Sequence, residues 1–197
     1  MPRTFPEEPF YAEDKGEGRT KLHDLLCTIS KHSSSAGYTQ GLNYVVASLL
    51  FHCGEVLAFE MTIRALNDYH LKEVHMSKLP GLYYHCDVIR ALLKVELPDL
   101  TAHFESMSID VMVFCQNWIM CVFTQVVPLN QVQRLFSLFW RDGWLIIYRL
   151  ILCIFLEQKA EMLYDETEYQ IQQRLKNSNA MKSTVTKMDP IAQRINE

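Results

Sequence analysis

The sequence predicts an all-α fold, and three features of the 197-residue chain point to it. Apolar residues recur at the three- and four-residue spacing that places side chains on one face of a helix, as between Leu22 and Ile29. No stretch shows sustained alternation of apolar and polar residues between the turns that mark hairpins. Glycine and proline instead separate long apolar stretches, which suits helices joined by short connections.

The N-terminal part of the chain predicts a loop followed by helices. Residues 12–20 are charged and rich in glycine, which is typical of a surface loop. A helix is expected around residues 22–29, where the apolar residues share one face. Residues 41–51 are apolar and lead to Gly54, which is expected to end that helix, and a helical pattern resumes over residues 55–69.

The central part of the chain predicts two further helices. After a boundary at residues 80–81 (Pro-Gly), the apolar residues between positions 88 and 95 again share one helix face. Pro98 marks the next boundary, and Asp110 is expected to cap a helix that begins at residue 111. Polar residues interrupt the apolar stretch 111–127. We therefore interpret it as a core helix rather than a membrane span, which needs about 20 apolar residues.

The C-terminal part predicts two helices and a polar tail. A helix is expected from about residue 128 to residue 140, and Gly143 separates it from the next. Residues 144–156 are apolar on all sides and too short to span a membrane, so they are expected at the centre of the fold. We predict one domain over residues 1–175 and a polar tail over residues 176–197.

Composition and charge exclude several classes of function. Hydrophobic residues make up 49% of the chain and charged residues 21%, which is ordinary for a globular protein. The net charge is −4 and no basic stripe is present, so no nucleic-acid partner is expected. The six cysteines form no C-x-x-C pair and are expected to be reduced thiols among apolar neighbours. The seven histidines lack zinc-ligand spacing, so no metal site is expected.

Residues 37–44 (GYTQGLNY) are the strongest candidate for a functional site. Glycines bracket a polar turn that opens into an apolar helix, and glycine lets a partner approach the backbone closely. A helix N-terminus favours a nearby anion such as phosphate. The amide of Gln40 both donates and accepts hydrogen bonds, which would let it orient a water against a phosphoryl group. On these residues alone, an ordinary loop-to-helix junction is the simpler interpretation.

Two motifs in register change that interpretation. Residues 38–43 (YTQGLN) closely resemble the Y-x-Q-G-M-N motif of TBC domains, found in Rab GTPase-activating proteins, with Leu42 in place of the usual methionine. Residues 2–6 (PRTFP) resemble the end of the family's I-x-x-D-x-x-R motif, which commonly continues as R-T-F-P. The resemblance covers about residues 1–175 and implies the all-α fold of that family.

The resemblance also implies an activity. The chain would activate a Rab-type small GTPase by inserting two side chains in trans into its nucleotide site. Arg3 would neutralise charge on the transferring phosphoryl group, and Gln40 would orient the attacking water. Tyr38, Gly41 and Asn43 would bind the GTPase. The chain itself would need no cofactor, because the partner would bind GTP and Mg²⁺.

A second function stays open beside this one. The family's R-x-x-x-W motif should precede Arg3, and no counterpart to it stands before Arg3 here. We therefore expect an N-terminally incomplete domain, and the alternative is a catalytically impaired TBC-like scaffold or structural subunit of a larger assembly. Both functions suggest a cytoplasmic protein without a transmembrane segment. It would be peripheral at organelle membranes or part of a large cytoplasmic or cytoskeletal assembly.

Overall fold

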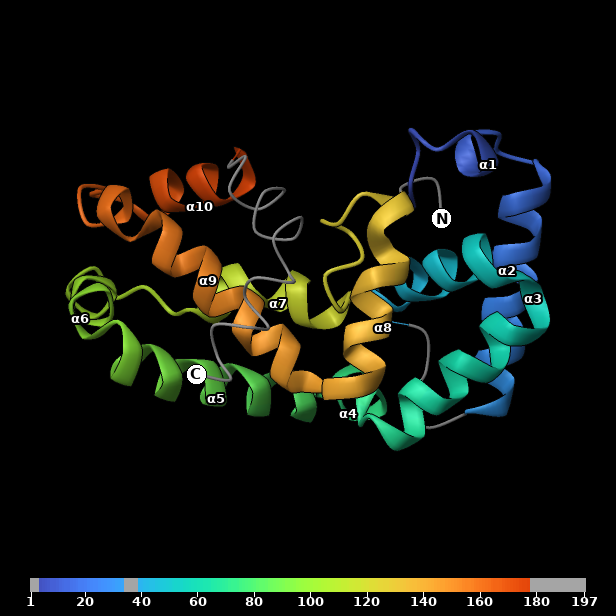
Figure 1. The fold of residues 1–197 in the computed structure, drawn as a ribbon, viewed down its shortest axis with the longest axis horizontal. Helices are drawn as coiled ribbons and strands as arrows, with labels where there is room; N and C mark the ends of the chain where they lie inside the picture. Colours follow the sequence, from blue (N-terminus) through green and yellow to red (C-terminus); the bar gives the residue numbers. More distant parts are fainter. Residues whose placement is uncertain (1–3, 34–38, 178–197) are drawn as a thin grey trace. The chain divides into compact units, whose positions relative to one another are not determined.

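The computed structural model describes residues 4–33 and 39–177, and all regular secondary structure within them is helical (Figure 1). In chain order, the elements of these residues are α1 (Pro9–Ala12), α2 (Glu17–His32), α3 (Leu42–Asp68), α4 (Leu71–His75), α5 (Pro80–Glu96), α6 (Pro98–Ser106), α7 (Met112–Met120), the short 3-10 helix η1 (Leu129–Gln131), α8 (Val132–Asp142), α9 (Trp144–Met162) and α10 (Glu168–Asn177). The all-α prediction is confirmed.

The chain divides into two compact units. Among the described residues, the first consists of 4–33 and 39–84 together with Asn117–Phe136, and the second of His85–Gln116 together with 137–177. The boundaries fall inside α5, α7 and α8. The last helix, α10, extends past residue 175, where the sequence predicted a polar tail to begin.

Helix α2 lies in the first unit and buries the face that its sequence predicts, from Leu22 to Ile29. It begins at Glu17, so the loop predicted over residues 12–20 is too long at its C-terminal end. Gly18 explains the difference, because a Cβ there would lie 2.1 Å from the carbonyl oxygen of Phe10. The glycine therefore serves a close approach of α1 to α2 rather than a flexible loop.

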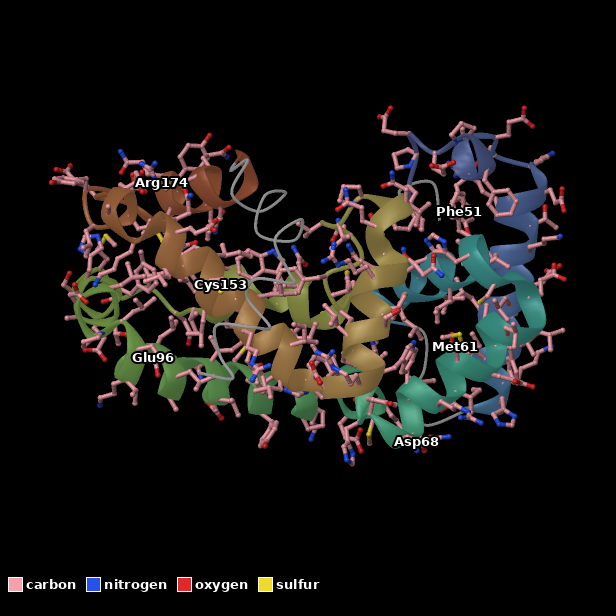
Figure 2. The ribbon with its side chains drawn as sticks, viewed as in Figure 1. Phe51, Met61, Asp68, Glu96, Cys153 and Arg174 are labelled. Atoms are coloured by element: carbon pink, nitrogen blue, oxygen red, sulfur yellow. The ribbon has the colours of Figure 1, made fainter. Side chains whose placement is uncertain are left out.

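Helix α3 is broken where the sequence predicted an end. Gly54 has φ 74° and ψ 178°, which interrupts the helical backbone. Figure 2 labels Phe51 before this break and Met61 after it. Among the described residues, α3 is the one helix long and apolar enough to cross a membrane. The break leaves two parts that are each shorter than the roughly 20 residues a span needs, and the first part is buried throughout Leu42–Leu50.

Helix α5 forms as predicted, but its buried face is not the predicted stripe between residues 88 and 95. Val95 at the end of that stripe is 74% exposed. The side chains buried on this helix instead include Leu82, Cys86, Ile89 and Leu93. Leucines stand at neighbouring positions 92 and 93, so two apolar stripes lie side by side, and periodicity alone does not choose between them.

The helix predicted over residues 111–127 is correct at its start and wrong in its second half. The Met112 N–H donates to Asp110 Oδ1 at 2.8 Å, which is the predicted cap. Helix α7 ends at Met120, and Val122 and Phe123 then take left-handed φ values of 48° and 59°. Such values are unfavourable for L residues, above all for a β-branched one. Both side chains are fully buried, so burial outweighs the helical pattern here.

The second unit contains the apolar helix predicted over residues 144–156. Gly143, with φ 61°, separates α8 from α9 as predicted. Helix α9 buries one side, where Phe155 contacts Phe104 and Phe114 with ring centroids 6.0 and 6.4 Å apart. Leu156 is 61% exposed, so the helix is not surrounded on all sides as its composition suggested.

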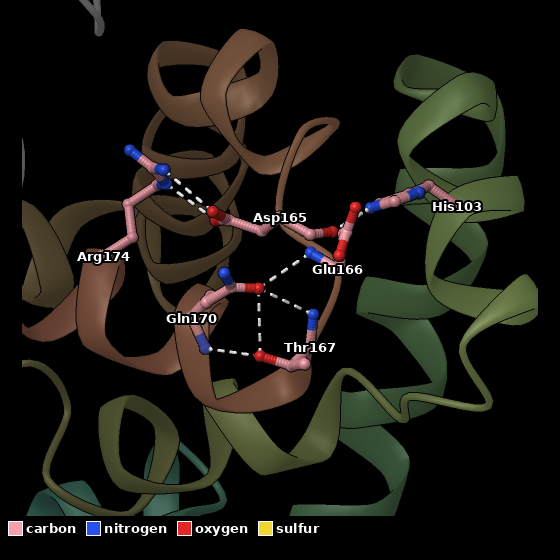
Figure 3. A network of polar contacts seen from close by, with 6 residues as sticks. All are labelled: His103, Asp165, Glu166, Thr167, Gln170 and Arg174. Carbon is pink, nitrogen blue, oxygen red and sulfur yellow. Dashed lines mark hydrogen bonds and ion pairs between the residues drawn. The ribbon is translucent and has the colours of Figure 1, made fainter.

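Polar contacts fix the start of α10 in the second unit (Figure 3). The Arg174 guanidinium donates to both carboxylate oxygens of Asp165, at 2.8 and 2.9 Å, and His103 Nε2 donates to the Asp165 carbonyl at 2.9 Å. Thr167 and Gln170 form a capping box, in which the Gln170 side chain accepts from the Thr167 N–H and the Thr167 hydroxyl accepts from the Gln170 N–H.

All six cysteines are free thiols. Cys86, Cys115 and Cys121 are buried, and burial raises the pKa of the Cys86 thiol to about 11, which keeps it protonated. These three match the expectation of small apolar side chains. Cys27 differs, because it lies on the solvent-exposed side of α2.

Candidate functional site

Gln40 lies in an exposed turn directly before α3. Gly41 follows it with φ 115° and ψ −47°, a conformation open to glycine and hardly to any other residue. A Cβ at Gly41 would lie 2.9 Å from both the Cβ and the carbonyl oxygen of Met120. The backbone of the turn therefore rests directly on the end of α7. Among the residues that the structure describes, none bonds to the Gln40 side chain, which leaves its amide available to a partner.

Asn43 connects this turn with the N-terminal segment. Its side chain is 5% exposed and forms two hydrogen bonds. Asn43 Oδ1 accepts from the Gly41 N–H at 3.0 Å, and Asn43 Nδ2 donates to the Thr4 hydroxyl at 2.7 Å. Gly41 follows Gln40 and Thr4 follows Arg3. One buried side-chain amide therefore holds the residues next to both predicted catalytic residues.

Aromatic contacts hold the same N-terminal segment against α3. Thr4 is 2% exposed, and the Phe5 ring lies edge-on to Tyr44 with centroids 5.3 Å apart. Tyr11 is fully buried and donates to the Ala47 carbonyl at 2.7 Å. Burial, with a smaller contribution from Glu8, raises the pKa of Tyr11, so its hydroxyl remains a donor. The residues that follow Arg3 are therefore anchored.

A buried histidine supports the turn from the other side. His75, the last residue of α4, is 1% exposed, and its Nδ1 shares a hydrogen bond with the Thr39 hydroxyl. Burial lowers the pKa of His75 from 6.5 to about 4, an effect that the nearby Met120 backbone partly offsets. The imidazole is therefore neutral at pH 7. Its Nε2 is also buried and forms no hydrogen bond of normal geometry.

The predicted site residues thus fall into three groups. Arg3 and Tyr38 lie outside the described residues. Gln40 is exposed, whereas Gly41 and Asn43 are buried. Burial leaves Gly41 and Asn43 little surface for direct contact with a GTPase, and their observed contacts hold the turn instead.

Sequence reasoning missed two further contributors, Thr4 and His75. Thr4 belongs to the R-T-F-P segment, so its place beside Arg3 was a usable signal. His75 gave no such signal, because it meets Thr39 across 36 residues of chain.

The site is an exposed turn rather than a cavity. Within residues 4–33 and 39–177, no group of three or more His, Cys, Asp or Glu side chains could hold a metal ion. A pocket of about 430 Å³ lies in the second unit, lined by α5, α6 and the segment between α6 and α7. It contains none of the predicted site residues. The surface around Gln40 therefore suits a macromolecular partner better than a small enclosed ligand.

Comparison with known sequences identifies related proteins. Residues 1–163 match the family model of the Rab-GTPase-TBC domain. The chain is 29% identical over 161 residues to Rab GTPase-activating protein tbc-11 of Caenorhabditis elegans, which covers 82% of this chain and 17% of that protein. It is 27% identical over 170 residues to the human ecotropic viral integration site 5 protein homolog, covering 86% and 21%. The chain thus spans about a fifth of these relatives.

Solved structures have the same fold. The chain resembles the Chlamydomonas flagellar RabGAP TBC domain with a TM-score of 0.78 and 23% identity, covering 99% of this chain and 65% of that one. It resembles the Ypt/Rab-GAP domain of Gyp1p with a TM-score of 0.80 and 15% identity, covering 100% and 71%. At this level of identity the likeness establishes the fold.

Proposed function

This chain belongs to the Rab-GTPase-TBC domain family, and on that premise we propose that it accelerates GTP hydrolysis by a Rab-type GTPase. In this proposal Arg3 and Gln40 act together in trans in the nucleotide site of the partner. GTP and Mg²⁺ belong to the partner, and the chain supplies side chains alone.

One observation carries the proposal, namely the position of Asn43 between Thr4 and Gly41. Two side chains that act on one phosphoryl group must be held at a fixed separation, because small displacements of catalytic groups cost much of their effect. The Asn43 amide ties together the residues directly after Arg3 and Gln40. A loop-to-helix junction without catalytic function would not require that connection.

Gln40 has the chemistry for the first role. Its amide oxygen accepts a hydrogen bond from a water molecule while the amide N–H₂ donates to a phosphoryl oxygen, so one side chain orients the nucleophile toward phosphorus. The Gln40 side chain is exposed. The backbone on either side of it is fixed, because Thr39 bonds to His75 and Gly41 bonds to Asn43. Its reach into the partner then depends on its own rotamers alone.

Arg3 has the chemistry for the second role. A guanidinium stays charged at all physiological pH values, and its planar donors match two phosphate oxygens at once. A finger of this kind raises the rate of phosphoryl transfer by about 10³- to 10⁵-fold. Support comes from Thr4, which is buried and hydrogen-bonded, so that the chain next to Arg3 is anchored.

The remaining predicted contacts are assigned differently. We propose that Tyr38 binds the GTPase surface, as the resemblance implied. Gly41 and Asn43 are buried, so we propose that they act by holding the turn rather than by touching the partner. The cellular site would be the cytoplasmic face of the organelle membranes that carry the GTPase, where the chain needs no cofactor of its own.

Single-turnover GTP hydrolysis across a panel of Rab GTPases tests this function. The wild-type chain should accelerate hydrolysis by at least one Rab, and Gln40→Ala and Arg3→Ala should each lose most of that acceleration. Asn130→Ala, at an exposed position in η1, is the matched control and should behave as the wild type. Acceleration that is unchanged in both finger variants would refute the proposal.

The alternative function makes the opposite forecast. A catalytically impaired scaffold would bind its partners without changing the rate of hydrolysis by any Rab. In that case wild type and Gln40→Ala would both be inactive, and a stable complex with other subunits would be recovered from cells. The anchoring of Thr4 and Gly41 by Asn43 favours the catalytic function over the scaffold function.

A further inference from the structure

Gln40 is flanked by two residues that are each fixed to the protein interior. On one side Gly41 donates to Asn43 and rests on the Met120 backbone. On the other side the Thr39 hydroxyl bonds to His75 Nδ1. The Asn43 contact lies within the motif shared with the family, whereas His75 lies outside it, on the separate short helix α4.

His75 is placed where its ring can act on the turn. The side chain is 1% exposed, its Nδ1 bonds to the Thr39 hydroxyl, and the ring lies near the Met120 backbone. Met120 is the residue against which Gly41 packs, at 2.9 Å from the position of a Cβ. The imidazole therefore lies behind the turn, next to the groups that fix both neighbours of Gln40.

We infer that His75 is a positioning residue for Gln40, acting through the Thr39 hydroxyl to fix the backbone of the catalytic turn. This inference rests on the proposed GTPase-activating function and names a residue on which that function depends. His75 does not touch the GTPase or its nucleotide. Its role is to keep the Gln40 backbone in one conformation before the partner binds.

The neutral form of the ring suits this role. In a neutral imidazole one nitrogen is an acceptor and the other carries the proton. With Nδ1 as the acceptor, the Thr39 hydroxyl donates to it, and the ring proton is on Nε2. A leucine of similar size fills the same space but accepts no hydrogen bond, which leaves the Thr39 hydroxyl without its partner.

A set of substitutions separates positioning from mere packing. His75→Leu should lower the maximal single-turnover rate of GTP hydrolysis by about five- to tenfold, the equivalent of one lost hydrogen bond, with little change in the apparent affinity for the GTPase. His75→Asn should restore most of the rate, because its side-chain amide places an acceptor close to the position of Nδ1. His23→Leu, on the exposed side of α2, is the histidine control and should leave the rate unchanged.

A double-mutant cycle decides whether His75 acts through Gln40. In a Gln40→Ala background, adding His75→Leu should cause no further loss of rate, because the group that His75 positions is already absent. An equal loss in both backgrounds would overturn the inference. So would a His75→Asn variant that is no faster than His75→Leu.

A second measurement does not depend on activity. Hydrogen–deuterium exchange of the free chain should show the Gly41 amide exchanging about five- to tenfold faster in His75→Leu than in wild type or His75→Asn. Unchanged exchange would overturn the inference even if no Rab responded to the wild-type chain. Absence of any acceleration by wild type, with the exchange effect present, would instead count against the proposed function alone.

Discussion

Substitution of Gly41 by alanine tests the structural basis of the site most sharply. Two separate features oppose a side chain at this position. The backbone has φ 115°, which L residues rarely adopt, and a Cβ would lie 2.9 Å from the Cβ and carbonyl oxygen of Met120. Since one of the opposing atoms belongs to the backbone, rotation of a flexible side chain does not relieve the contact.

The magnitude follows from these two features. A residue held in a rarely populated φ/ψ region costs about 1–3 kcal/mol. Forcing an additional carbon into a packed site costs about 1–3 kcal/mol more, and the lower entropy of the unfolded alanine chain returns about 0.4–1 kcal/mol. We therefore expect Gly41→Ala to lower the free energy of unfolding by about 1–5.5 kcal/mol.

Gly54 supplies a matched control for this substitution. It also has a positive φ, 74°, but no atom lies within 4 Å of the position of its Cβ. Gly54→Ala should thus cost the backbone term alone, less the same entropy gain, which comes to about 0–2.5 kcal/mol. Urea denaturation of both variants measures the difference. Equal losses of stability would show that the Met120 contact does not constrain Gly41, which would refute the reasoning.

Three further predictions concern buried polar groups. Asn43→Ala should destabilise the chain by about 2–4 kcal/mol in urea denaturation, because it leaves the buried Gly41 N–H and the buried Thr4 hydroxyl unpaired. The control Asn130→Ala should change stability by less than about 0.5 kcal/mol. On acidification from pH 6.5 to about 4, wild type should lose about 3 kcal/mol more stability than His75→Leu, because only the unfolded state binds the proton in that window. Arg174→Met should cost about 1–2 kcal/mol in thermal unfolding by removing both bonds to the Asp165 carboxylate, and equal stability would contradict that assignment.

The sequence predicts the helical fold better than the way helices end. Gly54 and Gly143 were identified as breaks because glycine interrupts an otherwise apolar pattern, and both have positive φ in the structure. The turn after Met120 could not be predicted, because Val122 and Phe123 read as residues of a buried helix. Their left-handed backbone is stabilised by complete burial, a tertiary effect without a local signature.

The candidate site shows the same limit. Gln40 was identified from its motif, and its exposure agrees with a role in contact with a partner. Asn43 was assigned to the partner surface, since a motif does not tell a contacting residue from a supporting one. The structure adds that Asn43 is buried and bonded to Thr4 and Gly41, which is the basis of our proposal that it holds the turn. His75 could not be found, because the contact with the turn exists only after α4 has folded against it.

The central claim is that Arg3 and Gln40 form one site that recognises a phosphoryl group during transfer. Binding of the chain to a GDP-loaded Rab, with and without aluminium fluoride as a mimic of the transferring group, measures this directly. Because catalytic groups bind the transition state better than the ground state, the account predicts at least about 100-fold tighter binding with aluminium fluoride. It also predicts that Gln40→Ala and Arg3→Ala each lose this gain. Equal affinity in the presence and absence of aluminium fluoride, for every Rab tested, would contradict the account.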